Sequence, residues 1–328
     1  MQGSLMLDIS GTYLTAEDRQ LLRQPEVCGV ILFARNIEHP QQVRELCRAI
    51  RALRSDLLIG VDQEGGRVQR LRQGFVALPA MGRLIEADNP EQLAEECGWL
   101  MAWEVLAMGI DFSFAPVLDL DYGRSSVIGL RSFGPDAATV ERLAGAFLKG
   151  MQAAGMPAVG KHFPGHGWVT ADSHVDIPVD ERSFAQINQT DLQPFKRLKN
   201  LLAGMMPAHV IYPQVDTVPA GFSKIWLQDI LRQQLAYKGV LFSDDLSMAG
   251  AHVAGDAAQR MLAALTAGCD VGLLCNDRVA AELALSALQT QQVRPCRQLS
   301  VMQGHHLAQH DFQQHPRWQS ARQALKVI

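Results

Sequence analysis

Eight short runs of apolar residues recur along the chain, and most of them are followed by a stretch with helical spacing. Most runs are continuously apolar, which is typical of parallel strands that are buried on both faces. The predicted strands are Leu5–Ile9, Val30–Phe33, Leu57–Val61, Phe112–Pro116, Ala158–His162, Gly204–Pro207, Val240–Ser243 and Val271–Cys275. Eight strands with intervening helices within about 270 residues favour an α/β fold, and among these a closed (β/α)8 TIM barrel over an open sheet.

Helices are predicted between several of these strands, because apolar residues recur there at positions i, i+3, i+4 and i+7. They cover 43–53, 140–151, 230–235, 261–265 and 280–288, and Gly155 is well placed to end the second. No linker rich in proline, glycine and serine divides the chain. We therefore expect a single (β/α)8 domain over residues 1–328.

Composition and charge restrict the possible partners. The chain has 30 Lys and Arg against 34 Asp and Glu, a formal net charge of −4, and no long run of one sign. Because phosphate binding needs a basic face, we expect no nucleic-acid partner. The N-terminus has no basic region and Asp8 interrupts its apolar stretch, so it does not resemble a signal peptide. No segment reaches the ~18 uninterrupted apolar residues of a membrane span.

The cysteines include no C-x-x-C pair, so a zinc ribbon is not expected. We expect the cysteines to act as small, buried hydrophobic side chains. They are Cys28, Cys47, Cys97, Cys269, Cys275 and Cys296. A reducing, cytoplasmic location follows as the default. The tail from about Cys296 is polar and contains four histidines, namely His305, His306, His310 and His315. Such a tail could bind metal, but we expect its residues to be scattered and solvated.

Several predicted strands end in charged residues or histidine. Asp62 and Glu64 follow the third strand, Lys161 and His162 end the fifth, and Asp244 follows the seventh. In a (β/α)8 barrel the carboxyl ends of the strands converge on the face where active sites lie. Buried charges cost free energy unless they are paired, so their accumulation at one rim predicts a functional site. A structural ion-pair network would produce the same pattern.

Asp244 is the sharpest single candidate for a catalytic group. It follows residues that we expect in the barrel core, so its side chain would lie at the barrel mouth. A carboxylate there can attack an anomeric carbon and form a covalent glycosyl intermediate. Two other roles stay open for Asp244, a helix N-cap or an ion pair with arginine. Asp245, one residue further into the loop, is the better N-cap candidate.

The glycine- and proline-containing stretch 161–174 carries three histidines and an aspartate. Asp172 and His174 are two residues apart, which lets a carboxylate reach the imidazole Nδ1–H in an irregular loop. Such a pair can act as an oriented acid/base, since the aspartate sets the tautomer and favours the protonated ring. Spacing alone leaves two alternatives open: a metal site with His162, His166 and His174, or a purely structural loop.

The remaining polar candidates are Asp62, Arg67, Arg70 and Arg131. Carboxylate and guanidinium groups suit sugar hydroxyls, which both donate and accept hydrogen bonds, but they would equally suit a structural salt bridge. Trp168 would either stack on a sugar face or hold the loop in place.

Together these segments resemble glycoside hydrolase family 3. The resemblance rests on the strings GVILFARNI, VDQEGGRVQRL, FAPVLDLD, RSFG, GKHFPGHG, DSHV, MPAHVIYP and GVLFSDDLSM, which occur in order and with matching spacing over roughly residues 1–290. Within the family, the chain is most similar to the single-domain bacterial β-N-acetylglucosaminidases of peptidoglycan recycling. The resemblance implies a (β/α)8 barrel and a retaining, two-step mechanism.

The resemblance also implies a role for each candidate residue. Asp244 matches the family's nucleophile, His174 its acid/base, and Asp172 the partner that orients the histidine. The implied substrate contacts are Asp62, Arg70, Arg131, Lys161 and His162. Many family members carry a second α/β domain that supplies a glutamate acid. This chain ends too soon for such a domain, which agrees with a histidine acid.

The implied substrate is N-acetylglucosamine β-1,4-linked to 1,6-anhydro-N-acetylmuramic acid, with or without a stem peptide. No metal or cofactor is implied, and we expect a cytoplasmic monomer. The released muropeptides would contribute to the signal that induces chromosomal β-lactamase in some bacteria. Two alternatives from other classes are a metal-dependent barrel hydrolase and a non-catalytic saccharide-binding protein.

Overall fold

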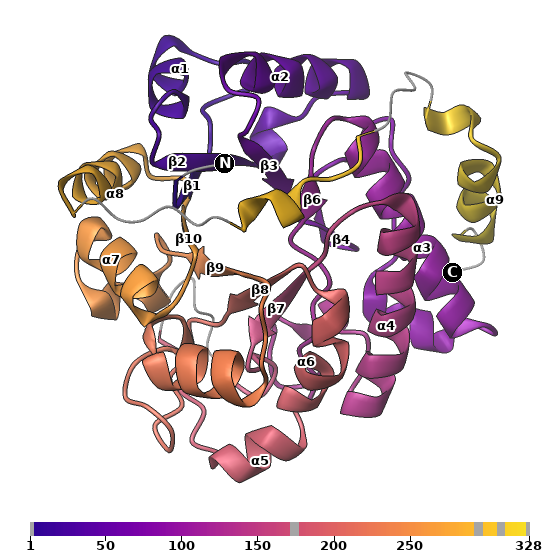
Figure 1. The fold of residues 1–328 in the computed structure, drawn as a ribbon. Coiled ribbons are helices and arrows are strands. Elements are labelled where there is room, and N and C mark those ends of the chain that lie inside the picture. Colours follow the sequence, from indigo (N-terminus) through magenta and orange to yellow (C-terminus); the bar gives the residue numbers. More distant parts are fainter. Residues whose placement is uncertain (1–2, 171–176, 292–297, 307–311, 326–328) are drawn as a thin grey trace.

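A computed structural model describes residues 3–170, 177–291, 298–306 and 312–325 of the chain. Within these residues, eight strands form a parallel sheet with helices around its outside (Figure 1). The strands are β1 (Leu5–Leu7), β2 (Val27–Leu32), β3 (Leu58–Val61), β6 (Phe112–Ser113), β7 (Val159–Phe163), β8 (Gly204–Pro207), β9 (Val240–Asp245) and β10 (Val271–Leu274). Each predicted strand is thereby confirmed, with boundaries that differ by at most three residues.

The sheet closes on itself. Its strand order is β6-β3-β2-β1-β10-β9-β8-β7, and the segment after β6 joins the two ends. The Val159 N–H donates to Ala115 O at 2.9 Å, and the Leu118 N–H donates to Lys161 O at 2.7 Å. A parallel bridge between Val117 and Lys161 completes the junction. The predicted (β/α)8 barrel is confirmed.

The strands are apolar throughout because both of their faces are covered. Every residue of β1, β2, β3 and β10 is buried. On one side of β3, Gly60 leaves room for the Phe112 ring, which a Cβ at this position would approach to 3.1 Å. The Phe112 ring packs against Phe114 and Phe242 at centroid distances of 5.0 and 5.6 Å. This packing accounts for the lack of alternation in the sequence.

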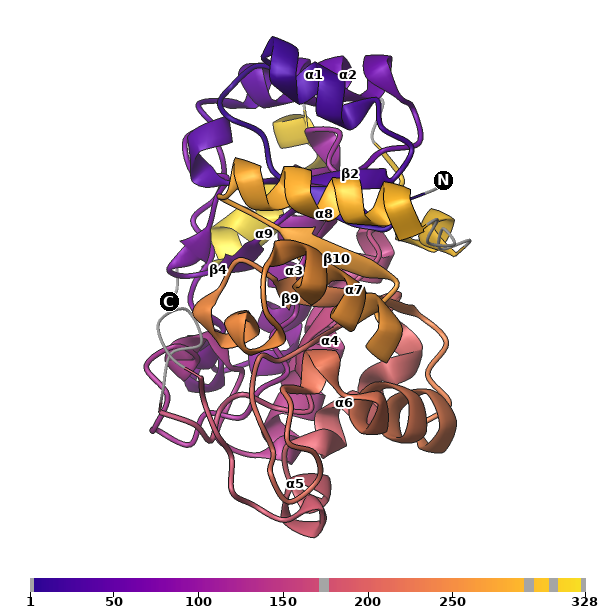
Figure 2. The same ribbon diagram turned by 90° about the vertical axis from the view of Figure 1, so that its left-hand side faces the viewer.

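Helices fill the connections, as Figure 2 shows for α7 and α8 beside β10. They are α1 (Ala16–Leu22), α2 (Pro40–Leu53), α3 (Pro90–Ala107), α4 (Ala137–Ala154), α5 (Phe184–Gln189), α6 (Leu192–Leu198), the π-helical η6 (Ile225–Gln234), α7 (Ala257–Ala267), α8 (Arg278–Gln291) and α9 (Pro316–Ala324). The five predicted helices are confirmed, and Gly155 ends α4 in the left-handed conformation at φ 85°. None of these helices, within the described residues, has the length and apolarity to cross a membrane.

Helix α3 has no single apolar face in the sequence, because it is covered on most sides. Its backbone packs directly against that of α4. A Cβ at Gly98 would lie 2.0 Å from Phe147 O, and one at Gly150 would lie 2.0 Å from Glu95 O. Such close approach requires glycine at both contacts. Periodicity therefore does not mark this helix.

The prediction of a solvated tail is confirmed for His305 and His306, which are exposed, but it is wrong for several apolar residues. Leu299, Met302, Phe312 and Trp318 are buried. The Trp318 Nε1–H donates to Glu104 Oε1 at 2.8 Å, which holds α9 against α3 (Figure 1). These apolar residues are too widely spaced in a polar segment to produce a periodic signal. The five cysteines within the described residues are buried, as predicted.

Candidate active site

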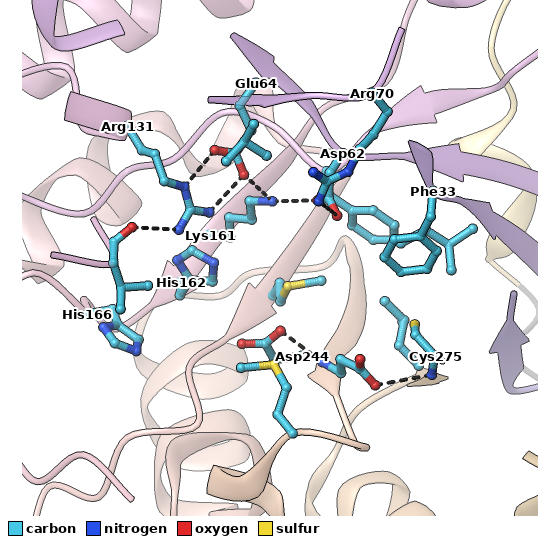
Figure 3. A pocket seen from close by; sticks show the side chains of 18 of the residues that line it. Phe33, Asp62, Glu64, Arg70, Arg131, Lys161, His162, His166, Asp244 and Cys275 are labelled. Carbon is cyan, nitrogen blue, oxygen red and sulfur yellow. Dashed lines mark hydrogen bonds and ion pairs between the residues drawn. The ribbon is translucent and has the colours of Figure 1, made fainter. Parts of the chain in front are cut away.

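A cavity of about 390 Å³ opens at the carboxyl ends of the strands (Figure 3). Six of the predicted site residues line it, namely Asp62, Arg70, Arg131, Lys161, His162 and Asp244. They lie in the last residues of β7 and β9 or in the segments that follow β3 and β6, so the barrel brings together residues that are far apart in the sequence. Arg67 lines the same cavity.

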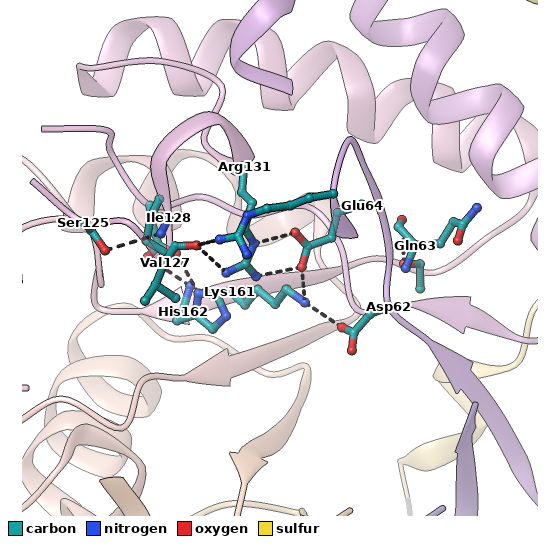
Figure 4. A network of polar contacts seen from close by, with 12 residues as sticks. Asp62, Gln63, Glu64, Ser125, Val127, Ile128, Arg131, Lys161 and His162 are labelled. Atoms are coloured by element: carbon teal, nitrogen blue, oxygen red, sulfur yellow. Dashed lines mark hydrogen bonds and ion pairs between the residues drawn. The ribbon is translucent and has the colours of Figure 1, made fainter. Parts of the chain in front are cut away.

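One wall of the cavity is a buried network of ion pairs centred on Glu64 (Figure 4). Glu64 lies in β4 (Gln63–Gly65), which forms a short hairpin with β5 (Val68–Gln69) directly after β3. Arg131 binds its carboxylate through two N–H groups, both at 2.8 Å. The Lys161 ammonium contacts Glu64 at 2.6 Å and Asp62 at 2.8 Å. Arg70 lies 3.7 Å from Asp62 at the outer end of this network.

The network keeps its members charged although they are buried. Burial alone would raise the pKa of Glu64, but the Arg131 and Lys161 cations outweigh it and hold that pKa far below its usual range. Burial alone would lower the pKa of Lys161, but the Asp62 and Glu64 carboxylates raise it. A ligand in the cavity therefore meets fixed charges. Such preorganised groups bind hydroxyls without further rearrangement.

A second carboxylate orients His162. The His162 Nδ1 lies 2.7 Å from Asp119 Oδ2, and Asp119 is fully buried. The backbone N–H groups of His162 and His166 also donate to Asp119, at 3.1 and 2.8 Å. Since a carboxylate only accepts, the His162 Nδ1 carries a proton and donates it to Asp119. Although burial would raise the pKa of Asp119, His162 lowers it.

Asp244 lies at the end of β9, partly exposed at the cavity. The Asp245 N–H donates to its Oδ1 at 2.8 Å. Burial alone would raise the pKa of Asp244, but the neighbouring His209 and His162 imidazoles and this N–H hold it below its usual value. Asp244 is therefore an ionised carboxylate at neutral pH. This is the state that a nucleophile requires.

The prediction that Asp245 caps a helix is wrong. The N-cap of α7 is Asp256, whose side chain accepts from Gln259 N at 2.9 Å. Asp245 belongs to β9, and its Oδ1 accepts from Ser247 N at 2.9 Å and Cys275 N at 3.2 Å. It therefore ties β9 to β10 directly behind Asp244. Helix α7 begins later because residues 246–255 first form a turn and the short 3-10 helix η7 (Ala249–Ala254), whose N-cap is Met248.

Asp119 and His209 are buried residues beside the candidate site that sequence reasoning did not single out, whereas Glu64 was noted only as one of the charges after the third strand. Each lies within six residues of a strand's last residue, the same signal that marked Lys161 and Asp244. His209 is fully buried, its Nε2 lies 3.1 Å from Asp245 O, and its ring stacks on Phe222. Burial lowers the pKa of His209, although the neighbouring Asp244 carboxylate acts in the opposite direction.

Asp172 and His174 lie outside the described residues. Trp168, shortly before them, has Arg124 and Arg182 over its ring at 4.2 and 4.4 Å. It does not form part of the cavity lining, so of its two predicted roles, holding the loop in place is the one that its contacts fit. Among the described residues, no three His, Cys, Asp or Glu side chains are grouped as metal ligands.

The fold and the cavity define a glycoside hydrolase on a (β/α)8 barrel. Residues 5–297 match the glycosyl hydrolase family 3 N terminal domain, and the chain belongs to this family. This confirms the resemblance inferred from the sequence strings.

Relatives with known names cover nearly the whole chain. It is 66% identical over 327 residues to a β-hexosaminidase of Pseudomonas aeruginosa, with 100% of this chain and 98% of the relative covered. It is 56% identical over 294 residues to a β-hexosaminidase of Methylobacillus flagellatus, with 88% and 84% covered. The structure of NagZ from Neisseria gonorrhoeae in complex with N-trifluoroacetyl-D-glucosamine matches with a TM-score of 0.90, 42% identity, and 99% and 97% coverage.

Proposed function

We propose that this enzyme is a retaining exo-β-N-acetylglucosaminidase. Its substrate would be N-acetylglucosamine β-1,4-linked to 1,6-anhydro-N-acetylmuramic acid, with or without a stem peptide. The observation that carries the proposal is an ionised Asp244 in the same cavity as the Asp62–Glu64–Lys161–Arg131 network. The names of the relatives and the N-acylated glucosamine named with the gonococcal structure support a hexosamine ligand.

In the proposed first step, an Asp244 carboxylate oxygen attacks C1 of the terminal sugar. The C1–O bond to the leaving sugar breaks, and His174 donates a proton to the departing oxygen. In the second step His174 takes a proton from water, whose oxygen attacks C1 and releases Asp244. Two inversions at C1 retain the β configuration. Asp172 would orient His174 and favour its protonated form before each donation.

The ion-pair network supports the binding part of the proposal. The Lys161 ammonium has three N–H donors, of which Asp62 and Glu64 accept two. The third can donate to a sugar hydroxyl, while Asp62 accepts from another. Arg70, Arg131 and His162 Nε2 supply further contacts from the walls. A cavity of about 390 Å³ is large enough to hold a terminal sugar.

The proposed biological setting is the recycling of cell-wall fragments. We place the enzyme in the cytoplasm as a monomer that acts on anhydromuropeptides and releases N-acetylglucosamine. No metal or cofactor takes part in the proposed chemistry.

Trapping of the intermediate tests the nucleophile. A 5-fluoro glycosyl fluoride of N-acetylglucosamine should label wild-type enzyme on the peptide that contains Asp244, as mass spectrometry would show. Asp244→Asn should not be labelled and should lose at least about a thousandfold in kcat on aryl β-N-acetylglucosaminides, as removal of a nucleophile does. Near-wild-type activity of this variant would sink the assignment. Saccharide binding without any turnover would instead favour a binding protein.

The leaving-group dependence tests the acid. His174→Ala should reduce turnover of a phenyl glycoside by roughly a hundredfold or more, and that of a 2,4-dinitrophenyl glycoside much less, because only a basic leaving group needs the proton. Equal losses on both substrates would contradict the role of His174. Stoichiometric zinc that is lost together with activity on chelation would favour the metal-dependent alternative.

A further inference from the structure

Asp244 lies at a β-bulge, where β9 departs from regular pairing with its neighbours. The register of β9 and β10 shifts there, because β9 has one residue more than β10 between two paired positions. The paired residues are Phe242 with Val271 and Asp245 with Leu273. On the other side of β9, the pairing with β8 ends at Leu241. Bulges interrupt the ladder and re-aim a side chain, so the ladder alone does not fix Asp244.

The carboxylate of Asp244 is oriented by the next residue in the chain. The Asp245 N–H donates to Asp244 Oδ1 at 2.8 Å (Figure 3). Of the described residues, only Asp245 donates a hydrogen bond to this carboxylate. The position of the Asp245 backbone therefore sets the direction of the Asp244 carboxylate.

His209 holds the carbonyl group of Asp245. The His209 Nε2 lies 3.1 Å from Asp245 O, and since a carbonyl oxygen only accepts, the imidazole donates. This bond joins the segment after β8 to the end of β9, beyond the point where their ladder stops. A hydrogen-bonded path therefore runs from His209 through the backbone of Asp245 to the Asp244 carboxylate.

The surroundings of His209 fix the position of its ring. The side chain is fully buried and stacks on Phe222, with ring centroids 5.6 Å apart and an interplanar angle of 18°. The backbone before and after His209 is bonded to the short helix η5 (Ala220–Phe222). These bonds run from Ala220 N to Val210 O at 3.0 Å and from Gly221 N to Ala208 O at 3.3 Å. The imidazole is thus a rigid support for residue 245.

The His209 ring is also one of the polar groups that face Asp244. Burial alone would raise the pKa of Asp244, but His209 from the segment after β8, His162 and Lys161 from β7, and the Asp245 N–H lower it. The groups around Asp244 therefore favour the ionised carboxylate as well as its orientation.

We propose that His209 is a positioning residue for the attack on C1, because it fixes the backbone of Asp245 and, through it, the Asp244 carboxylate. The inference rests on the proposed role of Asp244 as the nucleophile. His209 does not line the cavity, so it acts through residue 245 and not on the substrate.

His209→Gln and His209→Asn form a matched pair that tests this inference. Both introduce an amide, but the glutamine nitrogen can reach the position of the histidine Nε2, whereas asparagine is one methylene shorter. The rate of trapping by the 5-fluoro glycosyl fluoride at saturation measures attack by Asp244. We expect His209→Asn to lower this rate about tenfold or more and His209→Gln to stay within about threefold of wild type, since misplacing a reacting group costs up to about a hundredfold.

Two further measurements separate positioning from general damage. The inhibition constant of N-acetylglucosamine should be unchanged in both variants, because the Asp62–Glu64–Lys161–Arg131 network stays intact. The losses in kcat/KM on phenyl and 2,4-dinitrophenyl glycosides should be equal, because attack by Asp244 does not depend on protonation of the leaving group. His252→Asn is the control, since His252 also contacts a backbone carbonyl, Ser247 O at 3.1 Å, but is exposed. It should trap at the wild-type rate.

Equal trapping rates in His209→Asn and His209→Gln would overturn the inference, as would a loss of N-acetylglucosamine binding that parallels the loss in rate. Labelling of wild-type enzyme away from Asp244 would contradict the proposed function instead. Phe222→Leu provides a second route if His209→Asn does not fold, because it keeps the imidazole donor but removes the ring that holds its plane. Its trapping rate should fall while N-acetylglucosamine binding is retained, and an unchanged trapping rate in this folded variant would overturn the inference.

Discussion

Glu64→Gln is the substitution that most directly tests the buried network. Glu64 contacts Arg131 at 2.8 Å and Lys161 at 2.6 Å, and its side chain is 3% exposed. At an effective dielectric constant of about 20, each contact corresponds to about 6 kcal/mol of Coulomb attraction, most of which offsets desolvation. Removing one partner of a buried ion pair costs about 3–5 kcal/mol. Because glutamine keeps one acceptor for Arg131, we expect the lower end of this range, about 3 kcal/mol.

Thermal unfolding at pH 7 measures this loss. A change of about 3 kcal/mol should lower Tm by about 5 °C in a chain of this size. Glu86→Gln is the matched control, since Glu86 pairs with Arg83 at 3.0 Å but both side chains are more than half exposed. Exposed pairs contribute about 0–1 kcal/mol, so the Tm of this control should change little. Equal Tm values for the two variants would refute the reasoning.

The pH dependence gives a second check on Glu64. Its folded pKa is depressed below the ordinary value of 4.5, so its stabilisation is present above pH 4.5 and is lost as the pH falls toward the folded pKa. The Tm difference between wild type and Glu64→Gln should therefore be largest at neutral pH and shrink below about pH 4.5. A difference that grows on acidification would contradict the assignment.

Three further predictions concern other buried contacts. Burial raises the pKa of Glu104 to about 8, above its ordinary 4.5, so ionising it costs stability as the pH rises from about 4.5 through 8. The Tm of Glu104→Gln should therefore rise relative to that of the wild type as the pH increases across this window. A Tm difference that stays constant with pH would contradict the prediction. Gly167→Ala, whose Cβ would lie 1.7 Å from a backbone oxygen, should lose soluble expression, whereas Gly11→Ala, with no atom within 4 Å, should express normally. Asp245→Ala should lower kcat about tenfold or more, and Asp245→Asn should lower it much less. The asparagine amide keeps the acceptor for the backbone N–H groups of Ser247 and Cys275, and each of these bonds contributes about 1 kcal/mol. Equal kcat values for the two variants would count against a role of Asp245 in holding β9 in place.

Local sequence determined the barrel strands and the positions of Lys161, His162 and Asp244. A strand buried on both faces must be apolar, so a charge at its end marks the place where the chain leaves the core. That signal depends on a few consecutive residues, and it is visible in the sequence alone. The family strings then assigned roles to these positions, which spacing alone had left open between catalysis, metal binding and structure.

Only the tertiary structure decided which side chains pair with one another. Arg131 and Lys161 follow Glu64 by 67 and 97 positions in the sequence. Closure of the barrel brings both of them within hydrogen-bonding distance of the Glu64 carboxylate. Helix α3 and the tail show the same limit, since α3 is buried on most sides and the tail's apolar residues are widely spaced. Arg182 is another case, because its guanidinium pairs with Asp180 and Asp191 and lies over the Trp168 ring, which are contributed by separate segments. Burial and pairing are properties of the assembled barrel, so they determine which of the polar residues in the sequence act together.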